Sequence, residues 1–240
     1  MSELKTEARQ FYRLQGDAWD RIGEDFPRWV LTNVPEVPSP SDLLDFFASR
    51  LAGPRVLAAG CGPMPRDVDY LVRKGCRVVG IDLVPESVHK AHARSASSSD
   101  FAAVDLESSL PFKDGSFDAV LCVAVIQHIA RRTFLTVVLP EFERVLGDDG
   151  VLLLAFKRGN GVQKVEDRKL GLERTFQLFD PREVLEAALK TDLHPLPFGH
   201  GQAQWLEFAD EREIPHAVLM LQPRRPMSLE GWLSLLEAPA

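Results

Sequence analysis

The chain has 240 residues, 45% apolar and 26% charged, which is the composition of one globular domain and excludes wholesale disorder and fibrous repeats. Its 35 acidic residues exceed its 28 basic ones, and the net charge is −7. Because neutralising nucleic-acid phosphates requires Lys and Arg, this charge argues against general nucleic-acid affinity.

The three cysteines, Cys61, Cys76 and Cys122, show neither a CxxC pattern nor a Cys/His ligand spacing, so we predict no disulfide framework and no metal site. The first residues lack the apolar core of a signal peptide. No apolar stretch approaches the roughly 20 residues that span a bilayer. We therefore expect a cytoplasmic protein that does not associate with membranes.

The N-terminal quarter is predicted to be helical. Apolar residues recur at helical spacing over residues 3 to about 23. Residues 25–40 contain four prolines and are interpreted as a connector rather than an element. A second helix is expected to begin near Ser39 or Ser41, either of which can cap it, and to stop at Gly53. We assign residues 1–53 to an N-terminal helical segment.

From residue 54 the pattern changes to short apolar strands that alternate with helices. The expected strands are 55–59, 77–81, 101–104, 117–123 and 151–156, and the expected helices are 66–74, 86–96 and 132–146. This alternation predicts a doubly wound, mainly parallel α/β sheet with helices on both faces. Further along, we expect a polar stretch at 157–174, a helix capped by Asp180, and strands at 193–198, 204–208 and 217–221. The main domain then ends near residue 224, and residues 225–240 form a tail helix.

A glycine-rich turn follows the first expected strand of this domain. Gly60 and Gly62 lack a Cβ, so backbone approaches a ligand closely there, and the N-terminus of the next helix favours negative charge. The alternative is an ordinary tight turn.

Two acidic residues follow the next two strands. Asp82 is placed to accept hydrogen bonds from a ribose diol, and Asp105, followed by Leu106, is placed to accept from an adenine amine. The alternative for Asp82 is that it caps the following helix, and the alternative for Asp105 is that it only forms a turn. The turn and the acids together indicate a nucleoside cofactor without specifying which one.

The order of these motifs resembles the class I S-adenosylmethionine-dependent methyltransferases, in particular their small single-domain members. The resemblance rests on GCGP at 60–63, VVGID at 78–82, VDLESSLPFKDGSFDAVLC at 104–122 and EFERVLGDDGVLLLAFKRG at 141–159. It implies a Rossmann-like seven-stranded sheet whose last strand is antiparallel. It also implies that residues 54–224 are a methyltransferase domain and that residues 1–53 form a lid over it.

The resemblance assigns S-adenosylmethionine as the cofactor and S-adenosylhomocysteine as the product. The implied cofactor-binding residues are Ala59, Gly60, Cys61, Gly62, Asp82, Leu83, Asp105, Leu106, Cys122 and Val123. Two positions depart from the family pattern. Ala58 stands where the family has an acid, and Met64 replaces the third glycine, so the methionine end of the cofactor is expected to be held differently.

The acceptor is expected to bind near Gln127 and His128, where the family opens onto its substrate. We predict His128 as the general base, because a neutral imidazole can remove a proton from a hydroxyl or amine. The alternative is that it only shapes the pocket. The other predicted acceptor contacts are Tyr12, Trp19 and His200, and the further lid aromatics are Phe11, Phe26 and Trp29. The remaining histidines, His216 among them, are expected to be solvated or packing residues.

These observations favour methyl transfer to an O or N atom of a small molecule. A tRNA-modifying enzyme is an alternative, and it is supported by the basic stretch 157–174. This stretch includes Lys157, Arg158, Lys164 and Arg174. A second alternative, supported by Ala58 and Met64, is a degenerate, non-catalytic binding module. The sequence leaves monomer and homodimer equally open.

Overall fold

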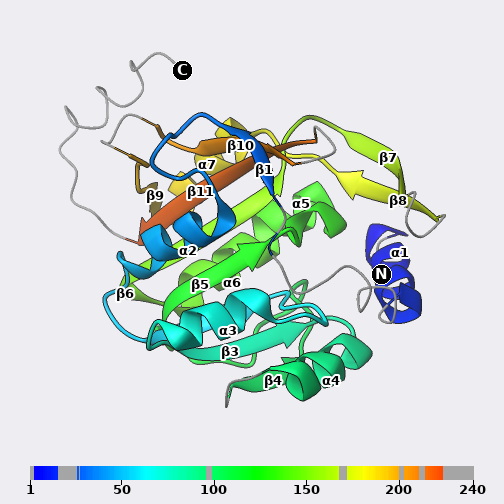
Figure 1. The fold of residues 1–240 in the computed structure, drawn as a ribbon, viewed down its shortest axis with the longest axis horizontal. Helices are drawn as coiled ribbons and strands as arrows, with labels where there is room; N and C mark the ends of the chain where they lie inside the picture. The colour runs from blue at the N-terminus through cyan, green and yellow to red at the C-terminus, as the bar shows by residue number, and fades with distance from the viewer. Residues whose placement is uncertain are drawn as a thin grey trace.

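The computed structural model describes residues 3–15, 26, 28–95, 99–167, 172–199, 203–210 and 214–223. Trp19, His200 and the predicted tail helix 225–240 lie outside these residues. In the described part of the chain, a nine-stranded sheet runs in the order β1-β10-β11-β6-β5-β2-β3-β4, with β9 paired to β11 (Figure 1). No helix in these ranges is long and apolar enough to cross a membrane.

Five neighbouring strands of this sheet are parallel, which confirms the predicted fold class. They are β2 (Arg55–Ala59), β3 (Arg77–Asp82), β4 (Asp100–Ala103), β5 (Phe117–Val123) and β6 (Leu146–Lys157). Because helices cover both faces, the central strands are apolar on both sides. The parallel arrangement brings the carboxyl ends of these strands to one edge of the sheet.

The remaining strands extend the sheet beyond β6, and each of them pairs antiparallel with its neighbour. They are β11 (Pro215–Pro223), β10 (Leu206–Asp210), β1 (Trp29–Thr32) and the short β9 (Leu193–Pro195). The sequence predicted seven strands with only the last one antiparallel. The described sheet has nine strands, so the predicted number is wrong. The expectation of a connector throughout 25–40 is also wrong, because Trp29–Thr32 pairs with β10. An edge strand needs only one partner, so nearby prolines do not prevent it.

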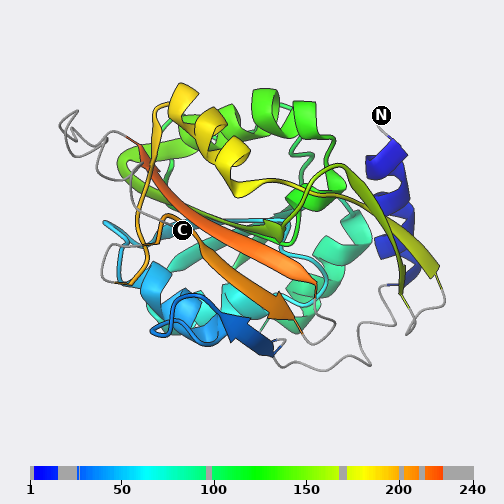
Figure 2. The same cartoon turned by 90° about the horizontal axis from the view of Figure 1, so that it is seen from above.

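Helices pack on both faces of the sheet (Figure 2). One face carries α6 (Leu139–Val145) and α7 (Pro181–Lys190), and the other carries α2 (Pro40–Ala48) and α3 (Arg66–Arg73). α6 continues the short helical segments α5 (Arg131–Thr133) and η3 (Phe134–Val138), and α4 (Pro85–Arg94) packs beside β4. The expected caps are confirmed: Ser39 Oγ accepts from the amide of Asp42 at 3.3 Å, and Asp180 Oδ1 accepts from that of Arg182 at 2.9 Å.

The N-terminal helix docks on a hairpin. The helix α1 (Glu3–Gln15) lies beside β7 (Val162–Asp167) and β8 (Leu172–Gln177), as Figures 1 and 2 both show. The amide of Thr175 donates to Glu7 Oε1 at 2.5 Å. The stretch 157–174 was expected only to be polar. Its described residues belong largely to a β-hairpin that holds α1 against the carboxyl edge of the sheet.

Candidate active site

A cavity of about 740 Å³ lies at the carboxyl edge of the parallel strands. This volume falls within the roughly 300–1,000 Å³ of small-molecule sites. The described residues from α1, the strand ends and the hairpin line it together. The predicted site residues among them are Tyr12, Gly60, Cys61, Gly62, Asp82, Leu83, Asp105, Leu106, Val123, Gln127 and His128.

Two predicted cofactor residues do not line this cavity. Cys122 is buried in the core on the α6 and α7 face, because alternate side chains of β5 point to opposite faces. Ala59 is buried in the same core and lines a separate cavity of about 30 Å³ behind the glycine turn. Both residues belong to the core that packs beneath the site.

The glycine turn is fixed to β3 by backbone hydrogen bonds. The amides of Gly60 and Cys61 both donate to the carbonyl oxygen of Ile81, at 2.7 and 2.9 Å. Gly60 has φ +79°, and a Cβ there would lie 2.2 Å from Cγ2 of Val125. Gly62 has φ +62°, but a Cβ there would meet open space. The turn requires glycine at both positions, for backbone conformation at both and for space only at Gly60.

Asp82 joins the turn to the end of β3. Its Oδ2 accepts from the amide of Gly62 at 3.0 Å and its Oδ1 accepts from that of Val84 at 2.9 Å. Burial raises the pKa of this carboxyl, and the backbone donors act in the opposite direction. Each carboxylate oxygen has two lone pairs, so each oxygen can also accept from a hydroxyl in the cavity.

Asp105 forms an ion pair with the N-terminal helix. Lys5 Nζ contacts Oδ2, while the amide of Glu107 donates to Oδ1 at 3.0 Å. The carboxylate expected to face an adenine amine is therefore shared with α1. Any ligand bound there lies directly under this helix.

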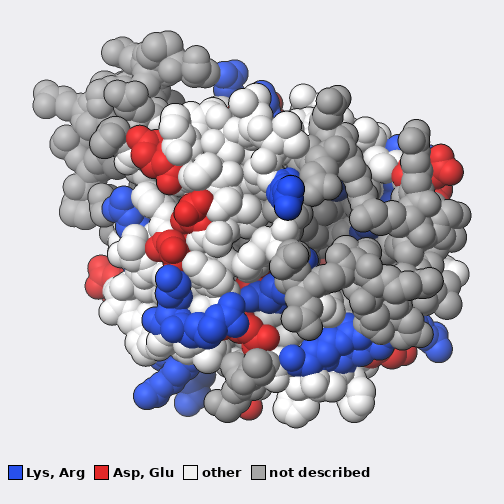
Figure 3. Space-filling model, in the orientation of Figure 1, with Lys and Arg blue, Asp and Glu red and all other residues white. Residues whose placement is uncertain are grey.

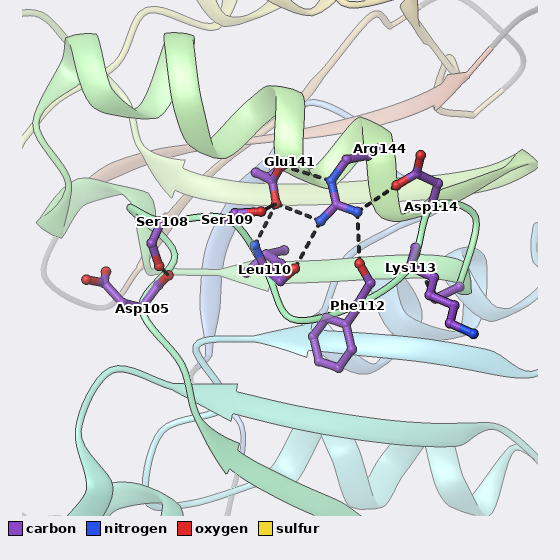
Figure 4. Close-up of polar contacts among 10 residues, drawn as sticks. Asp105, Ser108, Ser109, Leu110, Phe112, Lys113, Asp114, Glu141 and Arg144 are labelled. Atoms are coloured by element: carbon purple, nitrogen blue, oxygen red, sulfur yellow. Dashed lines mark hydrogen bonds and ion pairs between the residues drawn. The ribbon is translucent and has the colours of Figure 1, made fainter.

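Arg144 holds the loop that follows Asp105 (Figure 4). Its guanidinium donates to the carbonyls of Leu110 and Phe112, at 3.1 and 2.8 Å, and to Asp114 Oδ1 at 2.7 Å. Glu141 contacts the same guanidinium at 2.7 Å and accepts from the Leu110 amide at 2.6 Å. The bond from Arg144 lowers the pKa of Glu141. This network fixes the loop from α6, and its residues are not among those that line the cavity.

His128 lies under α1. Arg174 Nη2 donates to Tyr12 Oη at 2.9 Å, and the tyrosine O–H can in turn donate to His128 Nε2, 3.2 Å away. Desolvation, with the nearby charges of Arg174 and Lys157, lowers the pKa of His128 to about 3. A neutral imidazole with Nε2 already engaged is a weak base, so the contacts favour the pocket-shaping alternative. The general-base role stays a prediction.

Asp67, Lys157 and His216 are among the cavity-lining residues that were not predicted as site residues. Asp67, in the first turn of α3, lines both cavities beside the glycine turn; it forms no hydrogen bond with the described residues, and burial raises its pKa. Lys157 and His216, at neighbouring ends of β6 and β11, are buried in the cavity wall. Asp67 was visible as an acid just after the turn, whereas the other two depend on strand register.

The fold and this cavity define an α/β protein of the class I methyltransferase architecture. Residues 57–154 match the family model described as methyltransferase domain. This match lies within the part of the chain that carries the sequence motifs, and it agrees with the resemblance found there.

The chain is also similar to curated proteins and to solved structures. A ubiquinone biosynthesis O-methyltransferase of Xanthomonas campestris pv. campestris (strain B100) is 35% identical over 130 residues, covering 52% of this chain and 51% of the relative. The chain thus spans about half the length of this curated relative.

Two solved structures share the fold. The 1,6-didemethyltoxoflavin-N1-methyltransferase of Burkholderia thailandensis has a TM-score of 0.64 at 19% identity, covering 92% of this chain and 88% of that one. The magnesium protoporphyrin IX methyltransferase of Synechocystis PCC 6803 has a TM-score of 0.65 at 18% identity, covering 93% and 99%. At these identities the likeness concerns the fold.

Proposed function

We propose that the protein transfers a methyl group from S-adenosylmethionine to an O or N atom of a small molecule. The observation that carries this proposal is one continuous cavity that joins the glycine turn, Asp82 and Asp105 to Gln127 and His128. The curated relative and the two structural neighbours, named as methyltransferases with small-molecule substrates, support the same substrate class.

The residues present fit this cofactor. Asp82 offers both oxygens to the ribose hydroxyls, Asp105 and Leu106 offer a carboxylate and an apolar surface to adenine, and the turn leaves open space at Gly62. When bound, S-adenosylmethionine supplies a methyl group on a sulfonium; its transfer leaves S-adenosylhomocysteine and releases one proton from a hydroxyl or amine acceptor. Asp67 is placed to pair with the α-ammonium of the methionine moiety, in place of the acid missing at Ala58.

The chain's own contribution is positioning and exclusion of water. α1 covers the cavity and is held by Lys5 at one end of the site and by the contact of Tyr12 with Arg174 at the other. Holding donor and acceptor at reacting distance supplies most of the rate that such a displacement needs. His128 acts through Tyr12 as a positioning residue, and the released proton passes to solvent.

The alternative of tRNA modification draws less support. Lys157 is buried in the cavity, Arg158 pairs with Glu207 at 2.6 Å, and Lys164 pairs with Glu173 at 2.8 Å. On the face drawn in Figure 3, Lys and Arg gather over α3 with Asp and Glu beside them. The described residues of the basic stretch are thus partly buried and partly neutralised, so these residues offer few charges to phosphates.

Methyl incorporation from labelled S-adenosylmethionine tests the proposal. The protein is incubated with a fractionated small-molecule extract and, separately, with bulk tRNA. We expect label in the small-molecule fraction and none in tRNA. Label in tRNA supports the alternative; binding of the cofactor without incorporation in either fraction supports the degenerate module.

A further inference from the structure

A ladder of side chains crosses three neighbouring strands on the cavity wall. Phe208 of β10 pairs with His216 of β11, which pairs with Lys157 of β6. Side chains of directly paired residues lie on the same face of a sheet, and all three line the cavity. The rings of Phe208 and His216 stack with centroids 4.7 Å apart, and Trp29 stacks on Phe208 at 4.2 Å. The wall is therefore aromatic and ends at an ammonium group.

Lys157 is oriented by its neighbours. His216 Nδ1 donates to the carbonyl oxygen of Ile214 at 2.8 Å, so its Nε2 is the acceptor for Lys157 Nζ at 3.3 Å. Nζ also lies 4.9 Å from the ring centroid of Phe176. Only 7% of Lys157 is exposed. A buried ammonium interacts more strongly with an anionic group bound in the cavity than an exposed ammonium does.

A second cation lies against the same phenylalanine. The guanidinium carbon of Arg174 is 4.9 Å from the Phe176 centroid. The acidic residues that line the cavity within the described ranges are, in contrast, Asp67, Asp82, Asp105 and Glu107, and all four come from the cofactor side. The described lining residues of β6, β8, β10 and β11 are apolar, aromatic or basic. The described part of the acceptor end is thus basic and aromatic, a lining that suits an anionic ring.

Gln127 adds an unsatisfied acceptor at this end. The residue is 4% exposed and lines the cavity, and its Oε1 has no hydrogen-bond partner among the described residues. A buried acceptor without a donor costs about 1–3 kcal/mol. A ligand O–H or N–H near this atom removes that cost.

We propose that the acceptor is an aromatic acid, a ring that carries both a carboxylate and an O–H or N–H group. The carboxylate pairs with Lys157 and Arg174, the ring packs against Phe176 and Phe208, and the O–H or N–H donates to Gln127 Oε1. The same hydroxyl or amine is the methylated group. This inference rests on the proposed function, because it names the substrate class of that site.

Matched pairs of acids and amides test the inference on the protein saturated with S-adenosylhomocysteine. The probes are 3,4-dihydroxybenzoate, salicylate, anthranilate and indole-3-acetate, each with its uncharged carboxamide, and binding is measured by calorimetry. At least one acid is expected to bind about tenfold tighter than its amide. Lys157→Met should reduce that ratio to below about threefold, and Lys157→Arg should retain most of it. Lys164→Met, which removes an exposed lysine of the hairpin, is the control and should leave it unchanged.

Each outcome bears on a different claim. If S-adenosylhomocysteine itself does not bind, the proposed function fails. If it binds but no acid binds more tightly than its amide, or no probe binds at all, the inference is overturned. An acid preference that survives Lys157→Met unchanged also overturns it. The wild-type comparison needs no variant, so the test holds even if Lys157→Met does not fold.

Discussion

The amide of Gly62 donates a hydrogen bond to Oδ2 of Asp82 at 3.0 Å, across 20 residues of sequence. The bond joins the turn after β2 to the acid at the end of β3, so the two parts of the expected cofactor site are held together before any ligand binds. Such preorganisation lowers the entropic cost of binding.

Asp82→Asn is expected to weaken S-adenosylhomocysteine binding by at least about tenfold, or about 1.4 kcal/mol. The asparagine amide has only one acceptor oxygen, so it cannot accept from both Gly62 and Val84 and still serve a ribose. Calorimetry measures the change. Asp149→Asn, at an exposed position near the start of β6, is the control and should bind like the wild type.

Asp67→Asn is expected to separate the two ends of the cofactor. The variant should bind S-adenosylhomocysteine about tenfold more weakly but 5′-methylthioadenosine, which lacks the amino-acid group, within about twofold of wild type. Asp82→Asn should weaken both ligands. Equal losses for both ligands in Asp67→Asn would refute the pairing of Asp67 with the α-ammonium.

Gly60→Ala and Gly62→Ala are expected to differ in stability. Both place alanine at positive φ, which costs roughly 1–2 kcal/mol, but only the first also forces a Cβ against Val125. Overpacking adds about 1–3 kcal/mol. Urea unfolding should therefore show the larger loss for Gly60→Ala, with partial recovery in Gly60→Ala/Val125→Ala. Equal losses would mean that the contact with Val125 relaxes freely.

His128 is expected to make stability depend on pH. Its pKa in the fold, about 3, lies below the ordinary 6.5, so the unfolded chain takes up a proton first as the pH falls. The stabilisation is fully present above about pH 6.5 and is lost progressively toward pH 3. His128→Asn lacks this dependence, so its unfolding free energy should fall less than that of wild type between pH 7 and 5. The exposed His89→Asn is the control and should follow the wild type.

Arg144→Met is expected to lower the free energy of unfolding by about 2 kcal/mol, because it leaves two loop carbonyls without their donor and Glu141 without its cationic partner. S-adenosylhomocysteine should bind several-fold more weakly, since the loop carries Asp105. Urea unfolding and calorimetry measure the two effects. Arg132→Met, at an exposed position on the same helical segment, should change stability by less than about 0.5 kcal/mol. An unchanged affinity in Arg144→Met would separate the loop from cofactor binding.

The central strands were predictable because their signal is local. β2 and β5 have the bounds expected from their apolar runs, and the glycine turn and Asp82 follow from their position at strand ends. The strand β1 was missed because prolines surround it, and its pairing partner β10 is nearly 180 residues away in sequence. The hairpin β7–β8 was not predicted, because its exposed, charged residues are typical of a loop.

The acceptor wall was not predictable for a different reason. His216 was expected to be a solvated or packing residue, and Lys157 was considered as a surface contact for RNA. Their contact depends on the register between β6 and β11, which joins residues 59 positions apart. No local pattern specifies such a register, whereas the cofactor residues each follow a strand that the sequence reveals.

Calorimetric titration of the wild-type protein with S-adenosylhomocysteine tests the central claim most directly. The account predicts saturable binding of one molecule per chain, displaced by S-adenosylmethionine and weakened by at least about tenfold in Asp82→Asn. Absence of binding by the folded wild-type protein, or binding that Asp82→Asn leaves unchanged, would contradict it.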